Sequence, residues 1–188
     1  MPLSKSELRQ QARERRTALK AAAPDAGRRA AENFLAKIPL EKISVIAGYI
    51  AARDELDPAE LIEALRARGH IIALPRVTAK DQPLAFHRWD KNAAPVKGAY
   101  GLFEAVPDWP RIEPNVLLVP LLAFDVNRYR LGYGGGYYDR SLHALRGNAS
   151  ALAVGLAFAG QEITHIPREA GDEKLDWIVT EKGASKFG

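Results

Sequence analysis

Short apolar runs alternate along this chain with segments of helical patterning, and this alternation limits the possible folds more than any other feature. The runs are rich in β-branched residues and almost continuously hydrophobic, which is typical of strands buried on both faces of a parallel sheet. The sequence therefore predicts an α/β fold, a single-domain three-layer sandwich over residues 1–188 with a mostly parallel central sheet flanked by helices. No internal repeat or linker interrupts the pattern.

Caps and breakers define the expected elements. Ser4 and Glu7 form the S-x-x-E pattern of a capping box, so a helix is expected from this point to Ala23. Asp57 and Pro58 indicate another helix start, with proline at the first helical position. We expect further helices at 28–36, 58–68 and 137–146, and strands at 43–50, 70–74, 84–89, 116–119, 151–158 and 178–180. The segment 93–114 is predicted to be mostly loop, and its length suggests a function.

Composition excludes several classes of protein. The formal charge is +4, and it resides in residues 1–20, which hold six basic and two acidic residues, so a nucleic-acid role for the whole chain is weakened. The chain has no cysteine, which excludes disulfides, thiolate nucleophiles and Cys-ligated zinc, and fits a reducing compartment. The longest apolar run, 116–124, contains a proline and is far too short to span a bilayer. We expect a cytoplasmic protein.

The basic residues of the first helix fall on one side of it. On an ideal helix five of them lie within an arc of about 80°, with apolar residues beside that arc. They are Lys5, Arg9, Arg13, Arg16 and Lys20. This basic stripe is either a solvated face or a wall of positive charge that faces an anion, and the spacing alone favours the solvated face.

A glycine-rich segment between 120 and 140 carries the strongest chemical signal. Gly132 and Gly134 to Gly136 follow a predicted strand and lead directly into a predicted helix, and Arg128, Arg130 and Arg140 surround them. Backbone amides in such a loop and at a helix N-terminus favour an anion, most often phosphate. The spacing matches neither the Walker A motif nor the dinucleotide fingerprint. A glycine-rich turn without a ligand is the alternative, but the density of glycines, tyrosines and arginines disfavours it.

Four motifs together support a resemblance to a known family. They are Lys5-x-x-x-Arg9, Asp54-Glu-Leu-Asp57, Leu74-Pro-Arg-Val77 and, above all, Arg130-Leu-Gly-Tyr-Gly-Gly-Gly-Tyr-Tyr-Asp139. Over nearly its whole length the sequence resembles the 5-formyltetrahydrofolate cyclo-ligase family, also called methenyltetrahydrofolate synthetase. The resemblance implies an ATP- and Mg²⁺-dependent conversion of 5-formyltetrahydrofolate to 5,10-methenyltetrahydrofolate, with release of ADP and phosphate through a phosphorylated formyl intermediate. Such phosphoryl transfer requires mainly alignment and charge neutralisation from the protein.

The resemblance also implies roles for individual residues. The ATP-binding residues would be Lys5, Ser6, Glu7, Leu8, Arg9, Arg130, Leu131, Gly132, Tyr133, Gly134, Gly135, Gly136, Tyr137 and Tyr138. The folate-binding residues would be Ile50, Glu55, Tyr133, Gly134, Gly135, Gly136 and Tyr137. Arg130 and Tyr137 would be catalytic, and Asp139 and Asp172 would bind magnesium, a hard cation that takes oxygen ligands.

The sequence departs from the family pattern in places. Some members carry basic residues where this chain has Tyr133 and Gly135, so Arg128 is a candidate to balance the nucleotide charge. The family's usual Glu-Pro is Glu104-Ala105 here, which leaves the placement of Glu104 open. Trp89 and Trp109 could stack on a pterin, although a tryptophan without a known role more often belongs to the core or its rim.

Two other functions remain compatible with the residues alone. A sugar-phosphate isomerase or an acyl transferase of α/β type could use the glycine loop for phosphate without ATP. An RNA-binding module could use the basic stripe, although the first helix has no aromatic residues to stack on bases. We expect small-molecule substrates, a monomer, and neither a nucleic-acid nor a membrane partner.

Overall fold

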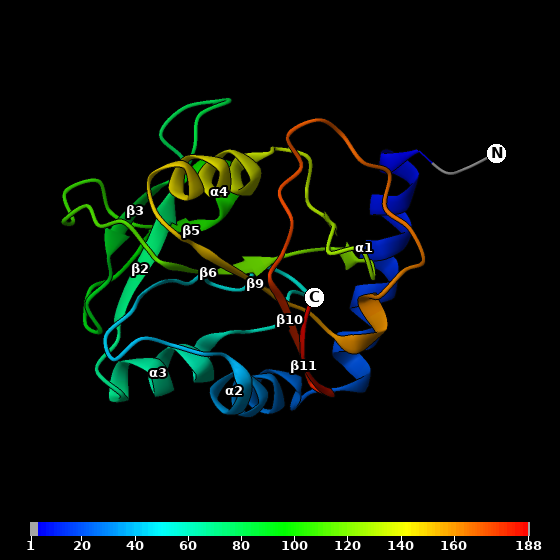
Figure 1. The fold of residues 1–188 in the computed structure, drawn as a ribbon, viewed down its shortest axis with the longest axis horizontal. Coiled ribbons are helices and arrows are strands. Elements are labelled where there is room, and N and C mark those ends of the chain that lie inside the picture. Colours follow the sequence, from blue (N-terminus) through cyan, green and yellow to red (C-terminus); the bar gives the residue numbers. More distant parts are fainter. Residues whose placement is uncertain (1–3, 188) are drawn as a thin grey trace.

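A central sheet organises the computed structural model, which describes residues 4–187 (Figure 1). Its strands are β1 (Val45–Ala47), β2 (Ile71–Arg76), β3 (Ala85–Arg88), β6 (Val116–Pro120), β9 (Leu152–Leu156), β10 (Trp177–Thr180) and β11 (Gly183–Lys186). The seven strands lie in the order β11-β10-β9-β6-β1-β2-β3. The five inner strands run parallel, and the edge strands β3 and β11 are antiparallel to their neighbours. The predicted mostly parallel sheet is confirmed.

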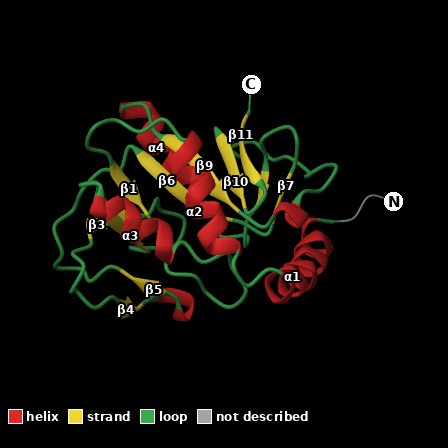
Figure 2. Ribbon diagram, turned by 90° about the horizontal axis from the view of Figure 1, so that it is seen from below, coloured by secondary structure: helices red, strands yellow, loops and turns green. Residues whose placement is uncertain are grey.

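Helices cover both faces of the sheet. They are α1 (Lys5–Ala22), α2 (Ala26–Lys37), α3 (Ala59–Ala67) and α4 (Tyr137–Asn148). Figures 1 and 2 show α2 and α3 against one face and α4 against the other, which confirms the three-layer arrangement. The helix α1 lies to one side, beside the small hairpin of β7 (Ala123–Phe124) and β8 (Arg130–Leu131). No helix among residues 4–187 is long and apolar enough to cross a membrane.

Successive residues of the inner strands fill two separate cores. Leu118 and Val154 face α2 and α3 and pack with Phe34, whereas their neighbours Leu117 and Ala153 face α4. This alternation explains the continuously apolar strands, because both faces of each inner strand are buried. A third, smaller cluster joins α1 to the β7–β8 hairpin; its buried members are Ala12, Leu122, Ala123, Leu131 and Ile166.

Several predicted boundaries differ from the structure. The strand predicted at 43–50 is only β1, and the helices predicted at 28–36 and 137–146 are each longer, as α2 and α4. The helix α3 begins at Ala59 rather than Pro58, and the Asp57 carboxylate accepts a hydrogen bond from the Ala59 amide at 3.0 Å. The strand β2 continues past 74 to Arg76 because β3 pairs with it as far as that residue.

The shortest strands were not predicted. The 93–114 segment contains the hairpin of β4 (Val96–Lys97) and β5 (Phe103–Glu104), joined by the 3-10 turn η1 (Ala99–Gly101). A second such turn is η2 (Ala159–Gln161). The strand predicted at 178–180 is followed by β11, which pairs with β10 and was not predicted. Two-residue strands and a strand of small and charged residues lack the apolar alternation by which strands are predicted.

Candidate active site

A capping box sets the direction of α1 at the edge of the site. The Ser4 hydroxyl accepts a hydrogen bond from the Glu7 amide at 3.3 Å, and the Glu7 carboxylate accepts one from the Ser4 amide at 2.8 Å. Leu8 packs against the third core cluster, and Ser6 is exposed. Of the residues expected near ATP in this turn, Glu7 therefore forms part of the cap and Leu8 packs in the third cluster. Lys5 takes part in neither contact.

Two basic residues of the stripe reach parts of the chain that are remote in sequence. The Lys5 ammonium lies 3.2 Å from the Asp172 carboxylate and 3.0 Å from that of Glu169. The Arg9 Nε donates to the Gly132 carbonyl at 3.0 Å. Helix α1 thus brings positive charge both to the glycine loop, defined as residues 132–136, and to the acidic segment around Asp172.

The rest of the stripe divides into a buried and an exposed part. Arg16 is 2% exposed, whereas Arg13 is exposed and Lys20 donates to the Arg53 carbonyl at 2.7 Å. A purely solvated face is therefore the wrong interpretation of the stripe.

The backbone of the glycine loop lies beside Arg9, at the N-terminus of α4. Gly134 has φ 102°, and a Cβ there would lie 3.5 Å from Cζ of Arg9, so the loop backbone and this guanidinium are in close contact. Gly136 has φ 66° and is the N-cap of α4, where it supplies no side-chain cap. The first amides of α4 are therefore not capped by a side chain, and the positive end of the helix dipole adds to Arg9. An anion fits this arrangement.

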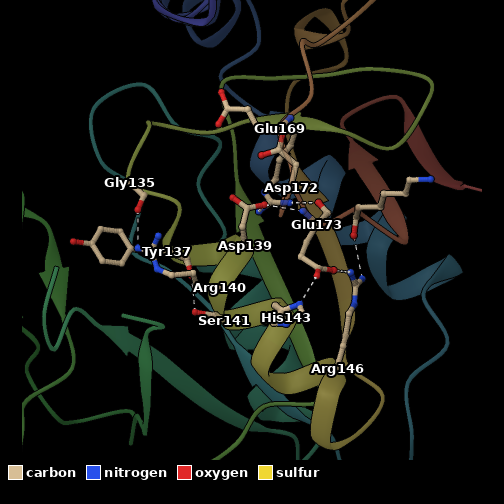
Figure 3. Close-up of polar contacts among 12 residues, drawn as sticks. Gly135, Tyr137, Asp139, Arg140, Ser141, His143, Arg146, Glu169, Asp172 and Glu173 are labelled. Atoms are coloured by element: carbon tan, nitrogen blue, oxygen red, sulfur yellow. Dashed lines mark hydrogen bonds and ion pairs between the residues drawn. The ribbon is translucent and has the colours of Figure 1, made fainter. Parts of the chain in front are cut away.

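Tyr137 connects α4 to the long loop. Its hydroxyl lies 3.0 Å from that of Tyr100 in η1, and this hydrogen bond raises the pKa of Tyr137. The Arg140 guanidinium lies 5.0 Å from the centre of the Tyr137 ring and donates to the Gly135 carbonyl at 2.7 Å (Figure 3). The hydroxyl of Tyr137 is consequently neutral at physiological pH.

Asp139 and Arg130 form a largely buried ion pair at the start of α4. The Arg130 side chain is 5% exposed, and its Nη2 donates to Oδ1 of Asp139 at 2.7 Å. Its Nη1 donates to the Glu173 carbonyl at 2.6 Å, and the Glu173 amide donates to the same Oδ1 of Asp139 at 2.9 Å. These contacts tie β8, α4 and the 169–173 segment together, and they place Asp172 next to Asp139 (Figure 3).

Asp139 and Asp172 each leave one carboxylate oxygen without a hydrogen bond from the described residues. In each, one carboxylate oxygen accepts all the hydrogen bonds made by the described residues: Oδ1 of Asp139, and Oδ2 of Asp172, which accepts from Lys5 and from the Glu169 amide. The other oxygen of each remains available to a cation. No group of three or more His, Cys, Asp or Glu suited to a metal exists among residues 4–187. Magnesium is commonly held by one or two carboxylates plus substrate phosphates, and this donor set suits that mode.

The candidate folate residues meet the glycine loop through Tyr133. Glu55 is 8% exposed; its Oε2 accepts from the Ala52 amide at 2.8 Å, and its Oε1 accepts from the Tyr133 hydroxyl. Burial and the nearby Glu55 carboxylate raise the pKa of Tyr133, so this hydroxyl stays protonated. Ile50 is half-buried in the segment that follows β1. Residues expected to bind folate thus lie beside residues expected to bind ATP.

The remaining candidate residues have structural contacts. Trp89 packs against the first core, with the Arg66 guanidinium 4.4 Å from its ring centre, so the structure supports the core interpretation of this tryptophan. The Trp109 carbonyl lies 2.6 Å from Nδ1 of the buried His87. Glu104 is buried, with its carboxylate 4.0 Å from Arg76.

Arg128 occupies the turn between β7 and β8, with φ 77°. It lines a small pocket together with Arg168, Lys174 and Tyr129.

Tyr138 is packed against the second core, where burial raises the pKa of its hydroxyl.

Sequence reasoning assigned no role to Asp125, which organises the hairpin that carries Arg130. Asp125 is 0% exposed. Its Oδ1 accepts from the amides of Asn127 and Tyr129 at 2.9 and 3.1 Å, and its Oδ2 accepts from the Ile166 amide at 3.0 Å. The available signal was an aspartate at the first position of the segment Asp125-Val-Asn-Arg128, since such side chains commonly bond backbone amides two residues on.

Replacing Asp125 by alanine should lower the free energy of unfolding by about 2–3 kcal/mol, because three backbone amides lose a charged acceptor. Urea denaturation measures this change. The matched control is Asp108→Ala, at an exposed position, which should stay within about 0.5 kcal/mol of the unmodified chain. Equal stability of the two variants would show that the hairpin does not depend on Asp125.

Known proteins resemble this chain in both sequence and fold. The model of the 5-formyltetrahydrofolate cyclo-ligase family matches residues 2–181. The chain belongs to this family. The resemblance found in the motifs is therefore confirmed, and the chain is an enzyme of the cyclo-ligase type.

Individual relatives agree with the family model. The chain is 31% identical to a 5-formyltetrahydrofolate cyclo-ligase of Mycolicibacterium smegmatis, over 96% of this chain and 95% of that one. It is 30% identical to the enzyme of that name from Escherichia coli K12, over 82% and 87% of the two chains.

Solved structures share the fold. The NMR structure of Aquifex aeolicus 5,10-methenyltetrahydrofolate synthetase superposes with a TM-score of 0.77 at 28% identity, covering 98% of this chain and 93% of that one. A 5,10-methenyltetrahydrofolate synthetase from Mycoplasma pneumoniae reaches a TM-score of 0.75 at 23% identity, over 95% and 99%, and this second likeness concerns the fold alone.

Proposed function

We propose that this chain converts 5-formyltetrahydrofolate to 5,10-methenyltetrahydrofolate, using ATP and Mg²⁺ and releasing ADP and phosphate. The observation that carries the proposal is the convergence of Lys5, Arg9 and the glycine loop at the N-terminus of α4, next to the buried Glu55. One side of this arrangement suits a triphosphate, and the other offers a carboxylate to a polar ring. The names of the relatives supply the reaction.

At the proposed phosphate-binding end of the site, charged residues are paired with one another and can exchange these partners for a ligand. In the free protein Lys5 is paired with Asp172 and with Glu169, whose side chain is 69% exposed. The pair with the exposed Glu169 contributes little stability, and an incoming triphosphate can compete with the part-buried Asp172 for the same ammonium group. Asp172 would then be free to share a cation with Asp139. Mg²⁺ and the phosphates therefore replace contacts that the protein makes within itself.

The residues around the transferred phosphate act mainly through charge. When bound, Mg²⁺ supplies charge neutralisation at the phosphate oxygens. Asp139 and Asp172 are proposed to hold it, and Arg130 is fixed beside them by Asp139 and the Glu173 carbonyl. A pre-oriented buried guanidinium needs no rearrangement as negative charge develops, which is the condition for efficient electrostatic catalysis.

The proposed reaction has two steps. The formyl oxygen attacks the γ-phosphorus of ATP, and the bond from that phosphorus to the bridging oxygen of ADP breaks. N10 then attacks the activated formyl carbon and releases its proton to solvent, and the carbon–oxygen bond to phosphate breaks as the ring closes. Tyr137, neutral and located at the first turn of α4, is proposed to hydrogen-bond the reacting groups.

The folate end is proposed to comprise Ile50, Glu55, Tyr133 and the backbone of Gly134, Gly135 and Gly136. Carboxylate oxygens accept hydrogen bonds, and Glu55 therefore suits the N–H groups of a pterin. Ser6, Glu7, Leu8, Leu131 and Tyr138 are proposed to border the nucleotide through backbone or packing contacts.

The alternative functions receive less support. Family membership disfavours a sugar-phosphate isomerase or acyl transferase. An RNA-binding role would need the basic stripe, but Lys5, Arg9 and Arg16 are turned into the protein. We propose that the chain has no nucleic-acid or membrane partner.

We also propose that residues 1–188 act as one domain and as a monomer in the cytoplasm. The absence of cysteine fits a reducing compartment. Size-exclusion chromatography with light scattering tests the monomer.

A spectroscopic assay tests the activity. Protein, Mg²⁺-ATP and 5-formyltetrahydrofolate are mixed, and the near-ultraviolet band of methenyltetrahydrofolate is followed over time. We expect the band to grow only when ATP and Mg²⁺ are both present, so omission of ATP and chelation of Mg²⁺ are the controls. A folded sample that forms no ATP-dependent product would contradict the proposed function.

A further inference from the structure

Arg16 is a buried charge on α1 that the proposed chemistry does not use. Its Nη2 donates to Oδ1 of Asp54 at 2.7 Å. Its Nη1 donates to the Leu121 carbonyl at 3.2 Å and to the Tyr133 hydroxyl at 2.5 Å. Its Nε is buried and has no hydrogen-bond partner among the described residues. The guanidinium therefore joins α1 to the end of β6, to the 54–55 segment and to the glycine loop.

Stability alone does not explain this arginine. Burying an ion pair contributes little net stability, and apolar side chains of similar volume commonly serve as well. A buried donor without a partner is a further penalty. Burial by itself would raise the pKa of Asp54, but hydrogen bonds from Arg16 and Thr17 outweigh that effect and lower the pKa, so the pair stays charged. What Arg16 provides is a fixed orientation for its neighbours.

The orientation that it fixes is that of the Tyr133 hydroxyl. A guanidinium has donors but no acceptor, so the hydroxyl accepts from Arg16 and must direct its own proton elsewhere. That proton goes to Oε1 of Glu55, whose other oxygen is held by the Ala52 amide. Tyr133 as a whole is 43% exposed, so its ring borders the open site while its hydroxyl is engaged. Arg16 on α1 therefore determines the direction of both hydrogen bonds of the Tyr133 hydroxyl.

We infer that Arg16 is a positioning residue that couples the two substrate sites, by tying α1 and the glycine loop to Glu55 through the Tyr133 hydroxyl. This inference rests on the proposed function. Helix α1 carries the phosphate-binding Lys5 and Arg9, and Glu55 faces the folate. A ligand that holds either end in its binding position therefore holds the other. ATP and 5-formyltetrahydrofolate consequently strengthen each other's binding, and the effect is reciprocal.

Tyr133→Phe tests the coupling most directly. The variant keeps the ring, whose centre lies 5.5 Å from Cζ of Arg16, and removes only the hydroxyl. Calorimetric titration with 5-formyltetrahydrofolate is performed with and without a non-hydrolysable Mg²⁺-ATP analogue. We expect the analogue to improve folate affinity about tenfold in the unmodified chain, within the usual range of such couplings. In Tyr133→Phe this improvement should vanish, so the folate affinities measured with and without the analogue should agree within about twofold, whatever the affinity of the variant for either ligand alone.

Tyr129→Phe is the matched control, since it removes the hydroxyl of a nearby tyrosine outside the glycine loop, and it should keep the full improvement. Arg16→Met should abolish the improvement as well, and Arg16→Met/Tyr133→Phe should behave like either single variant, because both act on one connection. Thermal unfolding shows whether Arg16→Met is folded, and Tyr133→Phe does not depend on that outcome.

Two different failures can be distinguished. If the unmodified chain makes product but shows no mutual improvement, or if Tyr133→Phe retains it, the coupling is refuted and the proposed function stands. If the unmodified chain makes no product from ATP and 5-formyltetrahydrofolate, the proposed function fails, and the coupling falls with it.

Discussion

Asp139→Asn should lower kcat by about 100- to 1000-fold while the fold stays intact, the scale on which loss of one electrostatic group acts in an active site. The side-chain carbonyl of asparagine can still accept from Arg130 and from the Glu173 amide, as Oδ1 of Asp139 does. What disappears is the negative charge and one of the two proposed magnesium ligands. The spectroscopic assay at varied Mg²⁺ concentration measures the effect, and the Mg²⁺ concentration at half-maximal rate should rise in parallel.

The structure also explains why asparagine is a sharper test here than alanine. Asp139→Ala should abolish turnover too, but it leaves Arg130, with a side chain 5% exposed, without its acceptor. The matched control is Asp176→Asn, since Asp176 likewise accepts from an arginine, Arg146, and from a backbone amide, both at 2.7 Å. The control should retain activity. Normal activity in Asp139→Asn would remove Asp139 from the metal site.

Arg9→Met should raise KM for ATP about thirtyfold, because the guanidinium beside Gly134 is proposed to bind the phosphates, and removal of such a contact commonly has an effect of at least this size. The KM for 5-formyltetrahydrofolate should change less. Initial rates at varied ATP concentration measure both constants.

Arg13→Met provides the comparison from the same basic stripe. Arg13 lies one turn further along α1 and is exposed, so its removal should change KM for ATP by less than about twofold. Equal effects in the two variants would mean that the stripe acts only as a diffuse positive field. An effect confined to Arg9→Met would instead identify a specific phosphate contact.

Much of this arrangement could be predicted because it depends on local patterns. Apolar runs buried on both faces predicted the parallel sheet, and the Ser4–Glu7 pattern predicted the observed capping box. Helical spacing placed Lys5 and Arg9 on one side of α1, where both now contact segments more than 100 residues away. The density of glycines indicated the loop that ends at Gly136, the N-cap residue of α4.

Other features depend on contacts that no local pattern encodes. The spacing of the stripe gave Arg16 and Arg13 the same weight, yet one is buried and the other exposed. Arg16 faces inward because Asp54, Leu121 and Tyr133, which lie far from it in the sequence, accept its hydrogen bonds. The role of Asp125 likewise depends on Ile166, whose amide it binds across the fold.

The position of α1 has a consequence for how this enzyme responds to heat. The helix packs on the β7–β8 hairpin and on η2, outside the two layers that enclose the sheet, and its own buried cluster is small. Elements with few buried apolar contacts open at lower free energy than the body of a protein. Since α1 carries the proposed phosphate contacts, warming can detach α1 from the hairpin, and the enzyme then loses activity while the sheet remains folded. Bound ATP would oppose this local melting by mass action, so the substrate also protects the enzyme against heat.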